Sequence, residues 1–195
     1  MKKILFAFVL CALISCQTRE PEIAEWRGKD RTGIYPDTGL LKEWPEEGPA
    51  EILVLENIGN GFGSPVFIED QFFVTGEIDS MARLFCYSLK GEEIWQSTPG
   101  KEWMKSYSGG RDAPTVVGDL VYMGTGLGDL YCINRADGKL AWSKKLKEDF
   151  NGVLPYHGFT NAPLVVGEKI FWTPGGREHN IVALNRHTGE MIWTN

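Results

Sequence analysis

The sequence lacks three features that would assign it to a well-defined functional class. It has no basic excess, since 26 acidic residues outweigh 20 basic ones and give a net charge of −6. This argues against a nucleic-acid partner, because phosphates are bound by cationic side chains. Its four cysteines show no C-x-x-C or similar spacing, so no metal site is predicted. Its longest apolar run has 12 residues, whereas a membrane-spanning helix needs about 20.

That apolar run, Ile4–Ser15, follows the positive segment Met1-Lys2-Lys3 and has the length of a signal-peptide core. It ends in Leu13-Ile14-Ser15-Cys16, which resembles a bacterial lipobox, where cleavage precedes a cysteine that becomes acylated. We therefore predict a lipoprotein signal peptide at 1–15 and lipidation at Cys16. The lipid would anchor the chain in the bacterial cell envelope, at the outer membrane or on the periplasmic side. The alternative is a plain secretory signal with an incidental cysteine.

Glycine and tryptophan are abundant, with 23 and 7 residues, and this combination favours a turn-rich repeat. Three copies of one pattern fill the chain from residue 64 onward, and their opening prolines, Pro65, Pro114 and Pro163, lie 49 residues apart. Each copy has four short β-branched or aromatic runs separated by Gly, Asp and Asn, which is typical of a four-stranded antiparallel meander. Each copy closes with Gly-x-x-x-Trp: Gly91 with Trp95, Gly138 with Trp142, and Gly189 with Trp193.

Four-stranded units of this length, repeated in series, predict an all-β fold of the β-propeller type. A solenoid is the structural alternative. The expected blades cover 64–97, 113–145 and 162–195 within a partial propeller at 51–195, and 51–55 is expected to be a lone strand. Cys86 and Cys132 fall at equivalent positions of the first two copies. An exported protein could join them in a disulfide, but two small buried thiols are favoured.

The Ala-Pro-x-Val-Val-Gly opening, the central Leu130–Asn134 and the Gly-Lys-x-x-Trp close resemble the pyrroloquinoline-quinone-like (PQQ-like) propeller repeat. Segments 26–28, 31–33 and 40–45 resemble the N-terminal region of exported bacterial lipoprotein members, so 16–50 is predicted to hold the lipidated N-terminus, a linker and this family-specific region. The resemblance implies that each blade-end tryptophan docks on a glycine-containing turn of the next blade. It also implies a ring of seven or eight blades, of which about three are present, with 51–55 as the outermost strand of the final blade.

Two loop regions carry candidate functional motifs. The segment Gly124–Asp129 lacks the third glycine of a dinucleotide-binding loop and is predicted to be a hairpin turn. The leaders before the second and third inner strands, 107–112 and 156–161, are expected to reach one rim of the central channel. They supply four ligand-face candidates: Arg111, Asp112, His157 and Asn161. The alternative is that these residues cap strand ends and line a watery channel. Trp103 lies in a leader outside the repeat, where we expect it to contribute little to stability.

The resemblance implies two classes of function. One is a non-catalytic binding or scaffold module, similar to the exported propellers of outer-membrane protein assembly. No catalytic residue and no cofactor are then expected, and the partners would be proteins or peptides of the cell envelope. The other is a quinoprotein alcohol dehydrogenase, which would require PQQ and Ca²⁺. Such enzymes stack the quinone on a disulfide of adjacent cysteines, and no Cys-Cys pair occurs in this sequence. The scaffold class is therefore favoured.

Overall fold

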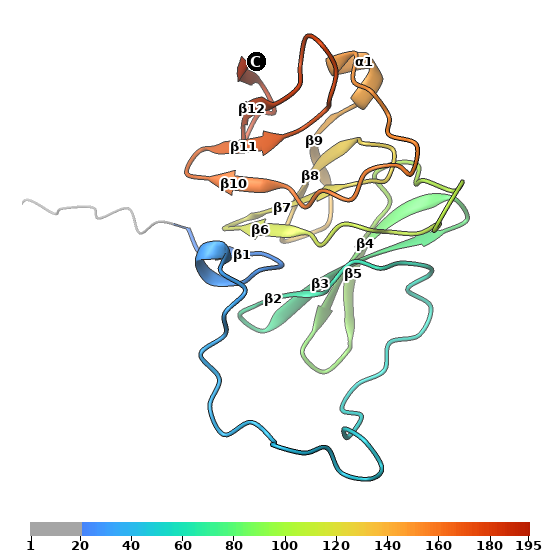
Figure 1. Ribbon diagram of the computed structural model, residues 1–195, viewed down its shortest axis with the longest axis vertical. Helices are drawn as coiled ribbons and strands as arrows, with labels where there is room; N and C mark the ends of the chain where they lie inside the picture. Colours follow the sequence, from blue (N-terminus) through green and yellow to red (C-terminus); the bar gives the residue numbers. More distant parts are fainter. Residues whose placement is uncertain (1–20) are drawn as a thin grey trace, which may run out of the picture.

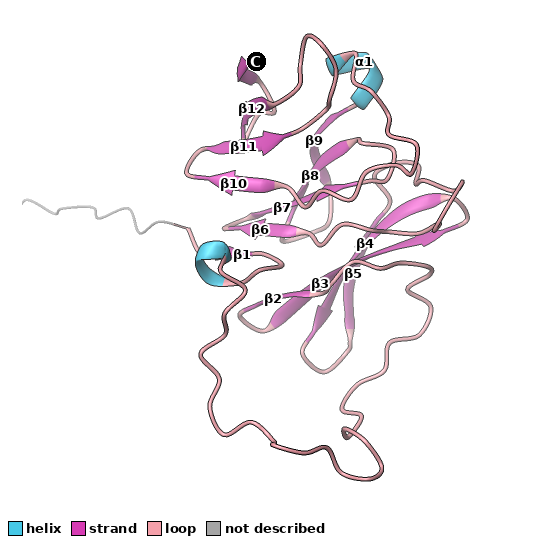
Figure 2. Ribbon diagram, in the orientation of Figure 1, coloured by secondary structure: helices cyan, strands magenta, loops and turns pink. Residues whose placement is uncertain are grey.

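The computed structural model describes residues 21–195, so the predicted signal peptide 1–15 and Cys16 lie outside the described residues. The described chain forms three antiparallel blades whose four strands follow one another in chain order (Figures 1 and 2). The first blade holds β2 (Val66–Ile68), β3 (Gln71–Ile78), β4 (Met81–Ser88) and β5 (Glu93–Ser97). The second holds β6 (Thr115–Val117), β7 (Leu120–Gly124), β8 (Leu130–Asn134) and β9 (Leu140–Lys144). The third holds β10 (Leu164–Val166), β11 (Lys169–Trp172), β12 (Val182–Asn185) and β13 (Met191–Thr194).

Each blade repeats one irregularity in its strand pairing, which confirms that the three copies are equivalent. The register between the third and fourth strands shifts beside the residue that lies opposite the blade-end tryptophan. That residue is Cys86 in the first blade, Cys132 in the second and Ala183 in the third. Both thiols are buried and free, as predicted. Burial raises the pKa of the Cys86 thiol to about 11 and that of Cys132 to about 12.

Apolar side chains from facing blades form the core. One cluster joins the first and second blades and includes Phe73, Leu84, Val116, Met123 and Tyr131. A second cluster joins the second and third blades and includes Tyr122, Leu130, Ile170, Trp172 and Leu184. Because a single four-stranded sheet cannot bury both of its faces, this stacking is what stabilises each blade.

The implied tryptophan docking is present at both interfaces between blades. The Trp95 indole Nε1 donates to the Arg135 carbonyl at 2.9 Å, and a Cβ on Gly138 would lie 2.6 Å from the Trp95 ring. Trp142 repeats the arrangement, with its Nε1 donating to the Arg186 carbonyl at 3.0 Å and its ring against Gly189. Both tryptophans are half-buried. Trp193 is 41% exposed, since the described residues include no following blade for it to meet.

The prediction of a strand at 51–55 is wrong. The segment forms no strand and Ile52 is 96% exposed, because an isolated β-segment needs a hydrogen-bonding neighbour and none of the described residues provides one. Leu53 nevertheless packs on the first blade, where a Cβ on Gly91 would lie 2.6 Å from its Cδ1. Since Gly91 corresponds to Gly138 and Gly189, Leu53 takes the place that a tryptophan holds at the other two glycines. Its role in closing a ring stays a prediction.

The N-terminal segment, residues 21–36, adds a fifth strand to the second blade that the sequence patterns did not predict. β1 (Ile23–Ala24) pairs antiparallel with β6, at the inner edge of that blade. A short 3-10 helix, η1 (Lys29–Arg31), follows it (Figure 1). The guanidinium of Arg31 donates to the Val165 carbonyl of β10 and pairs with Glu25 at 3.0 Å. The N-terminal segment therefore connects the inner strands of two neighbouring blades.

One α-helix occurs within residues 21–195. It is α1 (Leu146–Phe150), which lies in the leader of the third blade. Its Leu146 and Phe150 side chains are buried, so the helix is held by packing against the blades.

Candidate functional site

Arg111 joins the two leader loops. Its Nε and Nη2 donate to the Tyr107 carbonyl at 3.1 and 2.8 Å, and the same guanidinium also donates to the Ser106 and His157 carbonyls. It lies over the ring of Trp103, with 5.8 Å from its Cζ to the ring centroid. Because these donors are directed at backbone carbonyls of the protein, Arg111 acts in this structure as a clamp between loops.

Asp112 has the least satisfied side chain of the four candidates. It is 2% exposed, and neither carboxyl oxygen has a hydrogen-bond partner in the structure. Burial raises its pKa well above the usual range, and the charge of Glu102 raises it further, against the opposing effect of Arg111. Its oxygens lie against Gly124, where a Cβ would come within 2.3 Å of Oδ2. Because burial raises its pKa, this carboxyl binds a proton more readily than an exposed aspartate does, and in the protonated form it can donate as well as accept a hydrogen bond.

The other two candidates, His157 and Asn161, are exposed. The His157 ring lies edge-on to Tyr156, with centroids 4.8 Å apart, and only its backbone carbonyl contacts Arg111. The Asn161 Nδ2 donates to the Thr173 hydroxyl at 2.7 Å. The structure thus brings Arg111, Asp112 and Asn161 to the wall of one cavity, whereas His157 does not line it.

This cavity has a volume of about 720 Å³ and lies between the N-terminal segment and the inner strands of the second and third blades. Its wall combines aromatic and polar groups. The aromatic rings are those of Trp26, Phe62, Phe171 and Trp172. The N-terminal segment contributes Glu25, Trp26, Arg27 and Arg31. An apolar lining with a few convergent polar groups is typical of a binding site.

The sequence patterns did not predict the burial of two residues beside this site, Trp103 and Glu102, and one expectation is wrong. Trp103 is only 3% exposed, packs against Gly126 and Gly158, and donates from Nε1 to the Ser106 carbonyl at 2.9 Å. The expectation that it contributes little to stability therefore fails, because the leader loop folds back onto the rim. The glycines of the loops that pack on it, Gly126 and Gly158, were the available signal.

Glu102, the second missed residue, ties this leader to the hairpin turn at 124–129, which the structure confirms lies between β7 and β8. Its Oε1 accepts from the backbone N–H groups of Trp103 at 2.7 Å and Gly126 at 2.6 Å, while Oε2 has no partner. Burial is the main cause that raises its pKa to about 7, although both hydrogen bonds oppose the rise. Nothing in the local sequence marks this carboxylate as buried.

The described residues do not fit a quinone bound together with Ca²⁺. Calcium requires six to eight oxygen ligands, several of them carboxylates, and within residues 21–195 no three His, Cys, Asp or Glu side chains gather at a point that could hold a metal ion. Arg111, which was expected at the rim of the channel, already donates to carbonyls of the leader loops. None of the helices in this part of the chain has the length and apolar character needed to cross a membrane.

Comparisons with known proteins agree with the fold. The chain is 31% identical over 183 residues to the quinohemoprotein alcohol dehydrogenase ADH IIB of Pseudomonas putida, a match that covers 87% of this chain and 26% of that protein. It is 32% identical over 80 residues to the quinoprotein alcohol dehydrogenase PedH of Pseudomonas putida, covering 39% of this chain and 13% of the relative. The chain thus spans about a quarter or less of the length of these relatives.

A solved structure of quinohemoprotein alcohol dehydrogenase ADHIIG from Pseudomonas putida HK5 superposes with a TM-score of 0.52 at 21% identity, covering 71% of this chain and 21% of that one. This likeness supports the propeller fold and nothing finer. A family model described as outer membrane protein assembly factor BamB matches residues 80–195, which is more than half of the chain. With its repeated blades and docked tryptophans, the chain belongs to this family of PQQ-like β-propeller proteins.

Proposed function

We propose that the chain is part of an exported, lipid-anchored propeller that acts as a non-catalytic binding scaffold for protein or peptide partners in the bacterial cell envelope. The description of its family as an outer membrane assembly factor supports an envelope role. The fold alone does not decide between scaffold and enzyme, because one propeller architecture carries many functions.

The observation that carries the proposal is that the N-terminal segment of the chain occupies the inner edge of the second blade. Strand β1 pairs with β6, and the Arg31 guanidinium donates to the Val165 carbonyl of β10, so the chain's own N-terminal segment is bound along the inner edge of these two blades. Arg111 is likewise committed to backbone carbonyls. These contacts favour a structural rim over a redox centre.

The cavity offers the chemistry of peptide binding. Aromatic side chains such as Trp26 and Phe62, which are 56% and 66% exposed, can cover apolar side chains of a partner. The Asp112 carboxyl of the cavity wall is buried and unpaired, which is costly, so a partner that opens the wall and donates one hydrogen bond to it would gain affinity. Asn161, exposed at the cavity wall, could supply a second polar contact.

The alternative is an oxidoreductase of the quinoprotein alcohol dehydrogenase type, which the names of the two curated relatives favour. Under that alternative, PQQ and Ca²⁺ would be the cofactors, and the quinone would supply the redox chemistry. Residues 21–195 do not fit that pair, so a quinone site would have to be built by residues outside this range.

The two functions are separated by an activity test. The full-length protein, incubated with PQQ and Ca²⁺, should show no dye-linked oxidation of primary alcohols, and calorimetry should detect no tight Ca²⁺-dependent quinone binding. The ADH IIB relative, prepared in parallel, is the positive control. Turnover that requires both additives would overturn the scaffold proposal.

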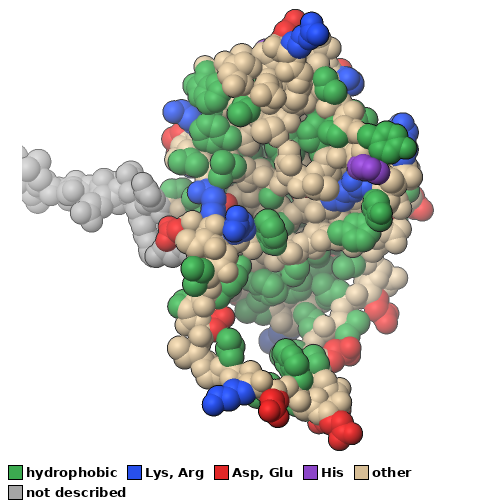
Figure 3. All heavy atoms as spheres, in the orientation of Figure 1, with side chains coloured by type: hydrophobic (Ala, Val, Ile, Leu, Met, Phe, Trp, Pro, Cys, Tyr) green, Lys and Arg blue, Asp and Glu red, His purple; other side chains and the backbone are tan. Residues whose placement is uncertain are grey.

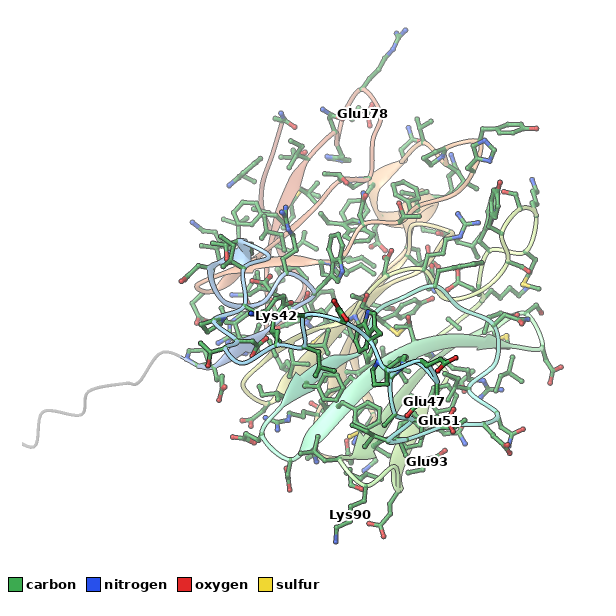
Figure 4. The ribbon with its side chains drawn as sticks, turned by 60° about the horizontal axis from the view of Figure 1, so that its bottom comes forward. Lys42, Glu47, Glu51, Lys90, Glu93 and Glu178 are labelled. Atoms are coloured by element: carbon green, nitrogen blue, oxygen red, sulfur yellow. The ribbon has the colours of Figure 1, made fainter. Side chains whose placement is uncertain are left out.

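A binding test adds positive support. A photo-crosslinking residue at Asn161, on the cavity wall, should form protein adducts in living cells that disappear when Asp112→Asn is added. The same crosslinker at Glu178, an exposed residue on a distant loop (Figure 4), should form none. Equal adducts at both positions would argue against a specific partner at the cavity.

A further inference from the structure

We propose that the N-terminal segment, residues 21–36, is a membrane-contacting surface that lies against lipid headgroups. This inference rests on the lipid anchor at Cys16 that forms part of the proposed function. It concerns the orientation of the protein on the bilayer, which neither the family description nor the relatives specify.

The first argument is the length of the tether. Pro21, where the described structure begins, comes five residues after Cys16. A fully extended chain covers about 3.3–3.6 Å per residue, so the tether spans about 18 Å at most. An acylated Cys16 therefore holds the start of the N-terminal segment close to the lipid surface.

The second argument is that the N-terminal segment is fixed to the blades. The Gly118 N–H donates to the Glu22 carbonyl at 3.2 Å, directly beside the β1–β6 pairing. On its other side, Arg31 reaches the Val165 carbonyl of the third blade. Because the segment is attached at both points, the short tether brings the rim of the blades, and not a loose arm, to the membrane.

The third argument is the character of the exposed side chains of this segment. Trp26, Ile34 and Tyr35 are 56%, 77% and 58% exposed. They form one group, since the Tyr35 hydroxyl donates to the Trp26 carbonyl at 3.1 Å and Ile34 is its neighbour in sequence. The Arg27 guanidinium lies 6.0 Å from the centre of the Trp26 ring. Tryptophan and tyrosine are enriched at the headgroup level of bilayers, and arginine can place its charge among the phosphates there.

The fourth argument is the contrast with the loop that follows. Residues 21–36 contain three basic and three acidic side chains, whereas 37–60 contain six acidic and one basic. Figure 3 shows basic side chains beside hydrophobic and acidic ones at the edge formed by the N-terminal segment, and mainly acidic charged side chains at the far end of this loop. Glu47 and Glu51 lie at that far end, away from the N-terminal segment (Figure 4). An anionic lipid surface would accept this segment and repel the distal loop.

The test compares two exposed isoleucines, one in each region. Cys86 and Cys132 are buried with raised pKa values, so a cysteine introduced at the surface can be labelled selectively. Ile34→Cys and the control Ile52→Cys, which is 96% exposed in the acidic loop, would each carry a nitrobenzoxadiazole fluorophore. The acylated full-length protein is then bound to vesicles of phosphatidylethanolamine and phosphatidylglycerol. We expect a blue shift at position 34 and no shift at position 52.

A second arm uses the unacylated Cys16→Ser protein with the same vesicles. Ile34→Glu should weaken its binding about tenfold, which corresponds to loss of one buried apolar side chain, and Ile52→Glu should leave it unchanged. Suppose that the acylated protein binds the vesicles and yet shows no shift at position 34, or equal shifts at both positions. Either result would refute the proposed membrane-contacting surface and leave the lipid anchor unaffected. If mass spectrometry finds no acylation, the prediction of a lipid anchor at Cys16 is wrong. In that case Ile34-dependent vesicle binding still supports the surface, and the absence of such binding refutes it.

Discussion

Single side chains decide how neighbouring blades hold together. Trp142 is half-buried, donates to the Arg186 carbonyl and lies on Gly189. We expect Trp142→Ala to lower the free energy of unfolding by about 2–3 kcal/mol, below the full range for a completely buried tryptophan. The measurement is chemical denaturation, and Trp44→Ala is the control, because Trp44 is 70% exposed. Equal midpoints for the two variants would show that the blade-end tryptophans do not dock.

The leader tryptophan should be at least as important as the blade-end ones. Trp103 is 3% exposed, and a Cβ on Gly126 would lie 2.4 Å from its own Cβ. Its truncation leaves a cavity under two leader loops, so Trp103→Ala should lower stability by about 3–5 kcal/mol. Denaturation of Trp103→Ala beside Trp142→Ala tests this. A Trp103→Ala midpoint close to that of the parent would mean that the rim is loosely packed.

Glu102 should make stability depend on pH near neutrality. Its folded pKa of about 7 lies above its ordinary value of 4.5, because burial disfavours the carboxylate. Between those two values Glu102 binds more protons in the folded protein than in the unfolded chain, so the stability that this group contributes is greatest below pH 4.5 and falls as pH rises towards 7. The loss approaches about 3 kcal/mol at most. Burial also raises the pKa of Asp112, so this group likewise lowers stability as the pH rises.

Glu102→Gln isolates this effect, since the amide oxygen can still accept from the Trp103 and Gly126 N–H groups. We expect urea denaturation of the variant to show a weaker decline in stability between about pH 5 and pH 8 than the parent shows. Asp112→Asn is the companion variant for the remaining decline. A parent whose stability rises over this interval would exclude a neutral Glu102 in the folded protein.

At the scale of elements, the contact of segment 51–55 with the first blade depends on Leu53. It lies on Gly91, at the place where Trp95 and Trp142 meet their own glycines. Leu53→Ala should therefore lower stability by about 1 kcal/mol, because the leucine is partly exposed. Ile52→Ala, at a neighbouring and almost fully exposed position, should have no effect. If the two variants unfold at the same denaturant concentration, the Leu53–Gly91 contact does not hold the segment.

The elements that repeat could be predicted from the sequence, and those that occur once could not. The 49-residue spacing and the closing Gly-x-x-x-Trp motif located all twelve blade strands, because the three copies can be aligned with one another. The strand at 51–55 was expected from its β-branched composition, but pairing depends on a partner that no local pattern reveals. β1 has only two residues and no alternation to mark it. Part of the candidate site could be predicted. The polar residues of the leader loop pointed to Asp112, whereas the burial of Glu102 depends on tertiary folding alone.

For the molecule as a whole, one segment unites three features. The N-terminal segment pairs with the inner edge of the second blade, forms part of the cavity wall and begins five residues after Cys16. If Cys16 is acylated, the anchor and the cavity are mechanically connected through residues 21–31. A scaffold built in this way would hold its cavity close to the lipid surface.

This arrangement depends on the identity of residue 16. The sequence Leu13-Ile14-Ser15-Cys16 places a small residue before a cysteine at the end of an apolar run. Cys16→Ser should therefore abolish acylation and leave either unprocessed precursor or protein released from the membrane, because stable anchoring needs more than one acyl chain and these chains are attached at this residue. Metabolic labelling with palmitate measures the outcome, and Cys11→Ser is the matched control, since Cys11 lies within the predicted signal peptide. Label that persists on the Cys16→Ser protein would remove the lipid anchor, and with it the tether that orients the N-terminal segment.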